Sequence, residues 1–469
     1  MTVMSPADFP GAKYRPPAPF PLEKKPGVPR LLFRLWRNPL TICGERHFDQ
    51  PIVAGETGIG HITVVSEPSA IRRVLVDRAE NYPKDARQMR ILKPGLRTGL
   101  LTADGEKWRI ARRTLAPLFS PRGVELHAQT MLRCSQDLTA RLSRRAEGRV
   151  VDVNAEMARV TFAILSKSMF SDSTQTDVLE FSAALNRYFN SAGRVDPLDA
   201  IGAPAWIPRL GLLWARPAIR FFERLVEKIV AERRRRMAAG DAIAADILTL
   251  LLRAQDPESG EKLSDSDVAG SIITFIGAGH ETTANTLAWT LFLLAKHPSA
   301  LAAVQAEIDR ADSRELTTWP DKLVVTRAVV EEAMRLYPPA PVISRTAIAA
   351  DVLGGVKVPK GSTIIVSPYI VHRHKTLWSE PDYFRPERFM PGFRERIPEF
   401  AYLPFGAGPR ICIGQRFSQL EAIVVLATLL RSLRFTMPKS RLAFPVHRVT
   451  LRPVPAINMS VFARRHAGW

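Results

Sequence analysis

The chain has 469 residues, 46% of them hydrophobic and 24% charged, so it can bury a large core and has the composition of an ordinary globular protein. Its formal net charge of +20 would suit nucleic acid, a membrane surface or an acidic protein partner. The basic residues are spread along the whole sequence, and the one dense run, residues 233–236, suits the C-terminus of a helix. This distribution favours a solvated surface, and we expect no nucleic-acid partner.

Residues 1–45 are predicted to form a proline-rich, basic segment and a short helix, and the sequence up to residue 40 contains no long apolar run. We expect neither a signal peptide nor a membrane-spanning helix there. Residues 31–40 mix Leu, Phe and Trp with Arg and Pro. Contact with a membrane surface is one interpretation, and a short surface helix that packs on its own domain is the simpler one. Cys43, Cys134 and Cys412 match no disulfide or zinc pattern, so a reducing compartment fits best and we expect a cytoplasmic protein.

Helical patterns dominate the sequence between about residues 105 and 270, after a predicted strand at 61–65 and a helix at 68–76. The most informative helix is predicted for residues 264–296, with Ser264 as N-cap and Asp265 and Asp267 in its first turn, where the helix dipole favours acids. At 1.5 Å per residue it would be about 48 Å long and could cross a whole domain. Its middle is apolar on all sides, as expected for a buried helix.

The C-terminal third combines strand, loop and helix signals. Residues 350–368 are predicted to form a hairpin with its turn at Gly354-Gly355, and residues 381–405 a long ordered loop. Another helix is expected from just after Cys412 to about Arg431, followed by strand at residues 448–461.

Residues 405–414, with the sequence FGAGPRICIG, have the features that a thiolate ligand of iron requires. The sulfur must stay deprotonated, and backbone N–H groups with the positive end of a following helix stabilise that anion. Gly408 and Gly414 allow a tight backbone path and the close approach of a flat macrocycle. Phe405 can keep water from the sulfur, and Arg410 can pair with a carboxylate. The alternative is a structural cysteine beside a glycine turn.

This loop resembles the heme-binding signature of the cytochrome P450 family, with Phe405, Gly408, Arg410, Cys412 and Gly414 at the matching positions. The resemblance, to soluble bacterial members, covers roughly residues 50–465. It implies a mainly α fold with a small β-rich lobe, in which residues 46–469 form a single heme-binding domain. The implied cofactor is heme b (iron protoporphyrin IX), with Cys412 as the axial ligand of its iron.

Further motifs agree with the family in the same order. Trp108 and Arg112 lie four residues apart on a predicted helix, so their side chains can reach the same heme propionate, and Arg345 falls where the family often places another propionate ligand.

Glu332 and Arg335 share a helix face and, in the family, form a buried structural triad with an arginine such as Arg388. By itself such a pair is an ordinary surface ion pair.

Ala278, Glu281 and Thr282 lie midway along the long helix, where polar side chains need a reason. Ala278 and its glycine neighbours leave space for a flat cofactor, and the Thr282 hydroxyl can bond the Ala278 carbonyl and open a local bulge. Glu281 and Thr282 resemble the acid–alcohol pair through which the family delivers protons to dioxygen. The alternative is a helix kink with Glu281 in a structural ion pair. His280 is expected to face another helix rather than bind metal.

The resemblance implies a monooxygenase that inserts one atom of dioxygen into a small apolar organic substrate, by hydroxylation or epoxidation. A peroxide-driven or rearranging enzyme, a heme-thiolate sensor and a nucleic-acid-binding protein are the competing interpretations. The sequence shows no flavin or iron–sulfur domain, so we expect electrons from a separate acidic ferredoxin or flavodoxin with its reductase. Lys107, Arg109, Arg113 and Arg416 should form its docking face. We expect a monomer.

The substrate pocket should draw on residues 87–102, 274–278, 340–344 and 455–457, most of which are apolar. Within the first segment, Arg87, Arg90 or Arg97 could anchor a substrate carboxylate. The simpler expectation is that all three face solvent.

Overall fold

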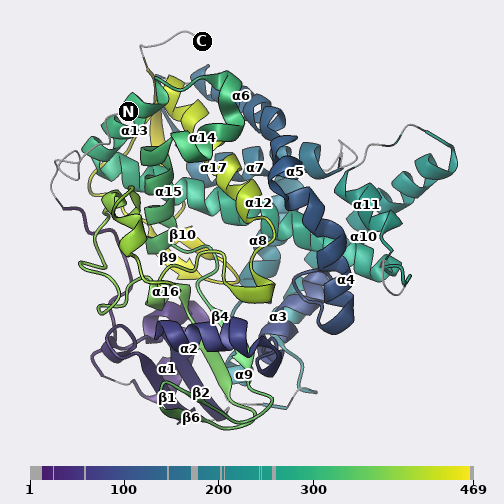
Figure 1. Cartoon of the computed structure of the whole chain (residues 1–469), viewed down its shortest axis with the longest axis vertical. Helices are drawn as coiled ribbons and strands as arrows, with labels where there is room; N and C mark the ends of the chain where they lie inside the picture. Colours follow the sequence, from purple (N-terminus) through teal and green to yellow (C-terminus); the bar gives the residue numbers. More distant parts are fainter. Residues whose placement is uncertain are drawn as a thin grey trace.

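The computed structural model describes residues 13–464, except 25, 58–59, 145–146, 171–177, 201–202, 205, 242, 244–245 and 256–259. Within this part the chain is mainly helical with small β-sheets, as predicted, and strands from both halves of the sequence gather at one end of the molecule (Figure 1). The α-helices are α1 (Val28–Arg37), α2 (Pro68–Arg72), α3 (Ala86–Leu96), α4 (Gly105–Leu115), α5 (Pro121–Glu125), α6 (Ala128–Ser143), α7 (Val153–Phe170), α8 (Val178–Ser191), α9 (Pro197–Ala200), α10 (Leu210–Ala238), α11 (Ile247–Arg253), α12 (Asp265–Lys296), α13 (Pro298–Ile308), α14 (Trp319–Lys322), α15 (Val324–Leu336), α16 (Pro368–Val371) and α17 (Gln415–Ser432).

The strands pair mainly with partners far away in sequence. The largest sheet has the order β1-β2-β7-β4, in which β2 and β7 are parallel and the other neighbours antiparallel. A second sheet has the order β3-β11-β8, and β9 pairs with β10 and β5 with β6. The strands are β1 (Ile52–Thr57), β2 (Gly60–Val65), β3 (Glu147–Asp152), β4 (Ile343–Thr346), β5 (Asp351–Leu353), β6 (Val356–Val358), β7 (Thr363–Val366), β8 (Leu433–Thr436), β9 (Phe444–His447), β10 (Leu451–Val454) and β11 (Asn458–Ala463).

Helix α12 is the central element of the core and has the predicted bounds. The Ser264 hydroxyl accepts a hydrogen bond from the Asp267 N–H at 3.2 Å, and Asp265 and Asp267 lie in the first turn, so the helix begins where its capping signals predict. It packs against α7, α10, α15 and α17, which explains why its sequence is apolar on nearly all sides. The helix ends before His297-Pro298.

The predicted hairpin at residues 350–368 is only partly correct. β5 and β6 form a two-stranded ribbon around Gly354-Gly355, as expected. The β-branched segment Thr363–Val366, however, leaves the hairpin and becomes β7, which pairs with β2 and β4 in the largest sheet. This long-range pairing buries Ile364 and Val366 completely, and a two-stranded ribbon could not do so.

No single helix in the described ranges is long and apolar enough to cross a bilayer. Helices α12 and α13 are long and apolar enough only when they are taken together, and the pair is bent by 115°.

Candidate active site

The loop around Cys412 is held in shape by its own backbone. The Cys412 N–H donates a hydrogen bond to the Phe405 carbonyl at 2.9 Å, which closes the loop ahead of α17. Gly406 and Gly408 have φ angles of +72° and +71°, a region that other residues adopt at a cost. A Cβ on Gly408 would lie only 1.9 Å from the Leu75 carbonyl oxygen, so the loop approaches the segment after α2 more closely than a side chain would permit.

Gly414 has a different role from the one predicted. Its φ of −84° is ordinary for any residue, so it is not required for a strained path. Its backbone N–H instead faces the Cys412 sulfur and lowers the pKa of that thiol. Cys412 is accessible, yet crowding by protein atoms raises its pKa overall, and the positive charge of Arg112 opposes this. Both stabilising groups act on the anion, as a thiolate ligand needs.

A basic cluster, defined as Lys84, Arg112, Arg345 and Arg410, lies beside this loop. Burial and the charge of Arg410 lower the pKa of Lys84 to about 7 and that of Arg345 to about 10. Among the described residues, Asp104 is the carboxylate that the cluster approaches, 2.7 Å from Arg410 and 4.0 Å from Lys84. Within the part of the chain that the structure describes, the Arg345 guanidinium has one hydrogen bond, to the adjacent Ser344 carbonyl at 2.9 Å. The cluster therefore has more buried positive charge than the chain neutralises.

Trp108 and Arg112 lie on α4, as predicted, but their side chains have different neighbours. The Trp108 ring stacks on the Arg410 guanidinium, whose carbon lies 3.9 Å from the ring centroid, and so orients that arginine. Arg112 is instead near enough to Cys412 for their charges to interact. The contact of Trp108 with Arg410 was not predicted, and the expectation that Trp108 and Arg112 reach the same heme propionate stays a prediction.

These residues fit a heme. An accessible thiol, faced by the Gly414 N–H and the charge of Arg112, lies beside cations in excess, and heme presents an iron and two propionates. Lys84 and Asp104, which also line an open hollow of about 680 Å³ against α3, were missed at the sequence level. Neither stands in a recognisable motif, and only the fold brings them to Arg410.

One turn in the middle of α12 is accessible to solvent. Ala278 is exposed and Gly279 and Thr282 are partly exposed, whereas every other residue from 267 to 294 is buried. The Thr282 hydroxyl donates to the Ala278 carbonyl at 2.8 Å, as predicted. An exposed turn inside a buried helix is the shape that a flat cofactor would cover.

Glu281 faces a different direction from Thr282. Its Oε1 accepts hydrogen bonds from Thr450 at 2.6 Å and from Arg452 at 2.5 Å, while its buried Oε2 has no partner among the described residues. The ion pair that was the alternative explanation for Glu281 is therefore present. The free oxygen leaves Glu281 one position at which it can still hold a water or a proton.

A second buried acid, Glu421 on α17, was not singled out from the sequence. Burial raises the pKa of its carboxyl well above the usual range, and a hydrogen bond with Thr283 opposes this. No sequence signal distinguishes it from an ordinary polar position on a helix. His280, by contrast, packs edge-on against Phe162 and Phe181 of α7 and α8, as expected for a histidine that faces other helices.

One of the predicted pocket segments, residues 87–102, lies against α12. A Cβ on Gly277 would lie 3.9 Å from side-chain carbons of Leu96 and Leu185, and one on Gly99 would overlap the Gly270 backbone at 2.2 Å. Segment 87–102 therefore packs directly on α12, and α8 adds Leu185, which lay outside the predicted segments.

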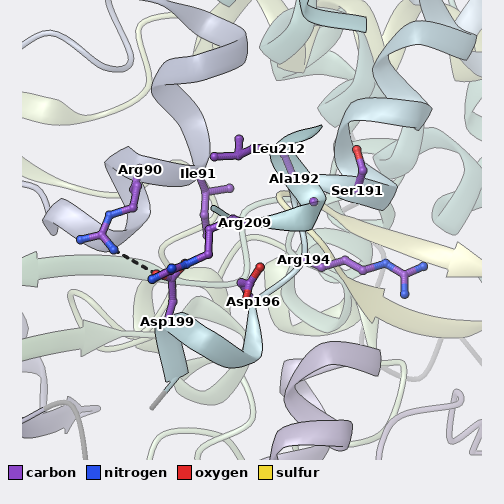
Figure 2. A pocket seen from close by; sticks show the side chains of 10 residues that line it. Arg90, Ile91, Ser191, Ala192, Arg194, Asp196, Asp199, Arg209 and Leu212 are labelled. Carbon is purple, nitrogen blue, oxygen red and sulfur yellow. Dashed lines mark hydrogen bonds and ion pairs between the residues drawn. The ribbon is translucent and has the colours of Figure 1, made fainter. Parts of the chain in front are cut away.

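The arginines of that segment have protein partners. Arg90 lies 2.9 Å from Asp199, and Arg97 3.0 Å from Glu223, as ion pairs (Figure 2 shows the first). Arg87 donates to the Thr363 hydroxyl at 2.8 Å. Arg90 and Arg97 therefore each have an acidic partner within the protein, although Asp199 is shared with Arg209, which also lies 2.9 Å away.

The predicted triad is present and buried. Arg335 donates to both oxygens of Glu332 at 2.7 Å, and the Arg388 guanidinium lies 3.7 Å from Glu332. Arg335 also donates to the carbonyls of His372 and Pro381, each at 2.7 Å. The network joins α15 to the loop that leads to Cys412.

Comparison with known proteins gives the same picture. The Cytochrome P450 family matches residues 42–458. Cyclooctatin synthase of Streptomyces melanosporofaciens is 31% identical over 428 residues, 90% of each chain, and pentalenene oxygenase of Streptomyces avermitilis is 28% identical over 94% of this chain and 97% of that protein. The crystal structure of cytochrome P450DA heme domain is similar with a TM-score of 0.78 at 26% identity, covering 97% of this chain and 98% of that one. The chain therefore belongs to the cytochrome P450 family, and it is an oxygen-incorporating oxidoreductase with heme b as its cofactor.

Proposed function

We propose that this P450 hydroxylates or epoxidises an apolar, uncharged hydrocarbon substrate, with Cys412 as the iron ligand and electrons from a separate acidic protein. The observation that carries the proposal is the accessible Cys412 thiol beside cations that the chain itself leaves unneutralised. When bound, heme supplies the activation of dioxygen and the insertion of one oxygen atom.

The chain would hold the heme from three sides. Cys412 would ligate the iron, with Phe405 and Gly408 shaping the loop and the Gly414 N–H supporting the thiolate. The guanidinium groups of Arg112, Arg345 and Arg410 would pair with the propionates, and the Trp108 ring, stacked on Arg410, would orient that guanidinium. Ala278 leaves room for the macrocycle against α12.

Proton delivery is assigned to Thr282 and Glu281. The Thr282 hydroxyl is fixed by the Ala278 carbonyl, so its lone pairs point to the open turn of α12. Glu281 is anchored by Arg452 through one oxygen and keeps the other available. The free oxygen of Glu281 can hold a water or a proton, and the Thr282 hydroxyl can orient a proton at the open turn of α12.

An uncharged, unsaturated substrate is supported by two observations. The relatives include proteins named pentalenene oxygenase, cyclooctat-9-en-7-ol 5-monooxygenase and carotene epsilon-monooxygenase, whose named compounds are alkenes. Two arginines of the segment proposed to cover the pocket already pair with protein acids, Arg90 with Asp199 and Arg97 with Glu223.

A spectral titration of the heme-loaded enzyme tests this substrate class. We expect pentalenene and the methyl ester of a long-chain acid to shift the heme spectrum, and the free acid to bind no more tightly than its ester. An acid that binds at least about tenfold more tightly than its ester would show an anchoring cation and contradict the proposal.

The redox partner is proposed to dock on α4. This helix carries Lys107, Arg109, Arg112 and Arg113 against the single acid Glu106, and Arg416 near the iron ligand is exposed. Glu106 pairs with both Arg109 and Arg113, at 3.1 and 3.0 Å, so the helix keeps a net positive charge. An acidic ferredoxin or flavodoxin would be steered there by long-range electrostatics.

Replacing Arg109 and Arg113 by Glu should raise the apparent KM for the partner by about tenfold at low salt, because redox encounters are small and depend on charge. Substrate affinity and the CO spectrum should not change. The matched control is reversal of the exposed Arg310 and Arg441, which lie outside α4 and the Cys412 loop. Equal reduction rates in both variants would place the docking face elsewhere.

The remaining assignments follow the same reasoning. The free thiols of Cys43 and Cys412 support a reducing compartment, and we propose a cytoplasmic monomer in which residues 46–469 act as one unit. Turnover with reductant, partner and substrate separates this enzyme from a sensor. Dependence on dioxygen rather than peroxide separates it from a peroxide-driven enzyme.

A further inference from the structure

Arg452 joins three elements that are far apart in the sequence. It lies on β10, its ion-pair partner Glu281 lies on α12, and its other two neighbours, Asn186 and Phe189, lie on α8. The three elements meet in the middle of the molecule (Figure 1). The Arg452 side chain is only 15% exposed, so it is held within the fold and does not extend into solvent.

The Arg452 guanidinium uses its nitrogens on two sides. Its Nε and Nη2 both lie 2.5 Å from Oε1 of Glu281, and its Nη1 donates to Oδ1 of Asn186 at 2.6 Å. The Phe189 ring lies against the same group, with its centroid 4.8 Å from the central carbon. Because a guanidinium is rigid and planar, a change at the Asn186 contact also turns the nitrogens that face Glu281.

Glu281 is held through one oxygen only. Arginine commonly pairs with both oxygens of a carboxylate. Here the two arginine nitrogens and the Thr450 hydroxyl, at 2.6 Å, all converge on Oε1, whereas the buried Oε2 has no partner among the described residues. A buried oxygen without a partner is unfavourable unless another contact compensates for it. The orientation of Arg452 therefore decides whether Oε2 stays available or is captured in a two-oxygen pair.

The neighbouring charges narrow the choice that Arg452 has. In the described part of the chain its ion pair is with Glu281, and Arg448 is a second cation near enough to interact with its charge. His280 also lies near Arg452 and Glu281, and burial lowers its pKa. The two arrangements open to Arg452 are thus Asn186 together with one oxygen of Glu281, or both oxygens of Glu281.

Helix α8 is the part of this arrangement that borders the proposed pocket. A Cβ on Gly277 of α12 would lie 3.9 Å from a side-chain carbon of Leu185, which precedes Asn186 on α8. The body of α8 packs mainly against α10 and α7. A substrate that lies beside Leu185 therefore bears on the helix that holds Arg452.

We propose that Arg452 is a positioning residue that makes proton delivery by Glu281 depend on where α8 lies. With α8 against β10, Arg452 is shared with Asn186, and Oε2 of Glu281 is free to hold a water or a proton. With α8 withdrawn, Arg452 turns to both oxygens and Oε2 is no longer free. This inference rests on the proposed role of Glu281 and adds a regulation to it.

The regulation has a chemical consequence. A molecule too small to hold α8 in place would leave Glu281 in the two-oxygen pair, so that proton delivery fails. Dioxygen would then leave as hydrogen peroxide, with two electrons from the redox partner and two protons from solvent, and no oxygen atom would enter the substrate.

Replacing Asn186 tests the link without changing Arg452 or Glu281. Asn190→Ala is the matched control for Asn186→Ala, because Asn190 is also an exposed asparagine on α8. The heme-loaded enzymes are supplied with a ferredoxin, its reductase and pentalenene. Asn186→Ala should lower the product formed per reductant consumed by at least about threefold, because one hydrogen bond to Arg452 is lost. The dissociation constant of pentalenene and the CO spectrum should not change, and Asn190→Ala should behave like the unmodified enzyme.

Infrared spectra report on the Glu281 carboxylate directly and need no turnover. Subtracting the spectrum of the corresponding Glu281→Gln variant isolates the carboxylate stretches, whose separation depends on whether one or both oxygens are paired. We expect Asn186→Ala to change this separation and Asn190→Ala to leave it as it is.

The inference is overturned if the carboxylate stretches of Asn186→Ala match those of the unmodified enzyme, because Arg452 is then only a structural partner of Glu281. It is also overturned if Asn190→Ala lowers the product formed per reductant as much as Asn186→Ala does. An unmodified enzyme that neither binds nor oxidises pentalenene would contradict the proposed substrate class instead, and the infrared comparison would still decide the role of Arg452.

Discussion

Gly406 and Gly408 have nearly the same backbone angles but different surroundings. Both have φ above +70°, yet a Cβ on Gly406 would meet nothing closer than Ile343 at 3.6 Å, whereas one on Gly408 would lie 1.9 Å from the Leu75 carbonyl. Left-handed backbone costs an alanine about 1–2 kcal/mol. A clash with backbone adds to that cost and has no flexible side chain to relieve it.

We therefore expect Gly406→Ala to lower the free energy of unfolding by about 1–2 kcal/mol and to keep heme. Gly408→Ala should disrupt the Cys412 loop and lose most of the bound heme. Heme content and thermal unfolding of the two purified variants measure this difference. Similar heme content in both variants would mean that the loop tolerates a shift away from Leu75.

Thr282 and Thr290 make the same local hydrogen bond at different depths. Each donates to the carbonyl four residues earlier, at 2.8 Å for Thr282 and 2.7 Å for Thr290, but only Thr282 lies at the open turn of α12. Thr282→Ala should preserve heme and substrate binding and lower the product formed per reduced cofactor, with hydrogen peroxide released instead. Positioned proton transfer is generally worth about 10²–10⁴-fold, so a loss of at least tenfold is expected.

Thr290→Ala is the matched control and should leave the ratio of product to consumed reductant unchanged. If both substitutions have the same small effect, the Thr282 hydroxyl serves only the helix backbone.

At the scale of helices and strands, the sequence predicts correctly those features that depend on residues close together in the chain. Neighbouring residues were enough to predict the N-cap and first-turn acids of α12, the tight backbone path at Gly408 and the helix that follows the Cys412 loop, but not the ordinary backbone of Gly414. The pairing of β7 with β2 and the contact of Arg452 with Glu281 join positions far apart in sequence. No periodicity in the sequence encodes such contacts. For this reason the predicted hairpin at residues 350–368 wrongly includes the segment that forms β7, and Arg452 is not predicted as the partner of Glu281.

Breaking the network that joins α15 to the loop before Cys412 should destabilise the fold by a measurable amount. Glu332 and Arg335 are fully buried, and removing one charge would leave the other without compensation. Glu332→Gln should destabilise the fold by about 3–5 kcal/mol and reduce heme incorporation. Glu315→Gln, which breaks the exposed pair with Lys322, should cost about 0–1 kcal/mol.

Denaturant unfolding of the two variants measures this contrast. A small effect for Glu332→Gln would mean that the carbonyls of His372 and Pro381 alone are sufficient to hold Arg335.

For the whole molecule, the fold gives part of the excess positive charge a location. Helix α4, beside the Cys412 loop, carries four basic residues against the single acid Glu106, and we assign this face to an acidic redox partner. The net charge alone would suit nucleic acid, a membrane surface or an acidic protein. Only the fold shows which arginines lie beside the iron ligand.

The central claim is that Cys412 ligates a heme iron as a thiolate, and the spectrum of the reduced CO complex tests it most directly. We expect the purified, heme-loaded protein to give the long-wavelength Soret band that a thiolate ligand produces, and Cys412→Ser to lose it, because a neutral hydroxyl is a poor iron ligand. A thiolate-type CO spectrum that persists in Cys412→Ser would contradict the assignment of this residue. An unmodified protein that binds heme without that band would contradict the account of the whole site.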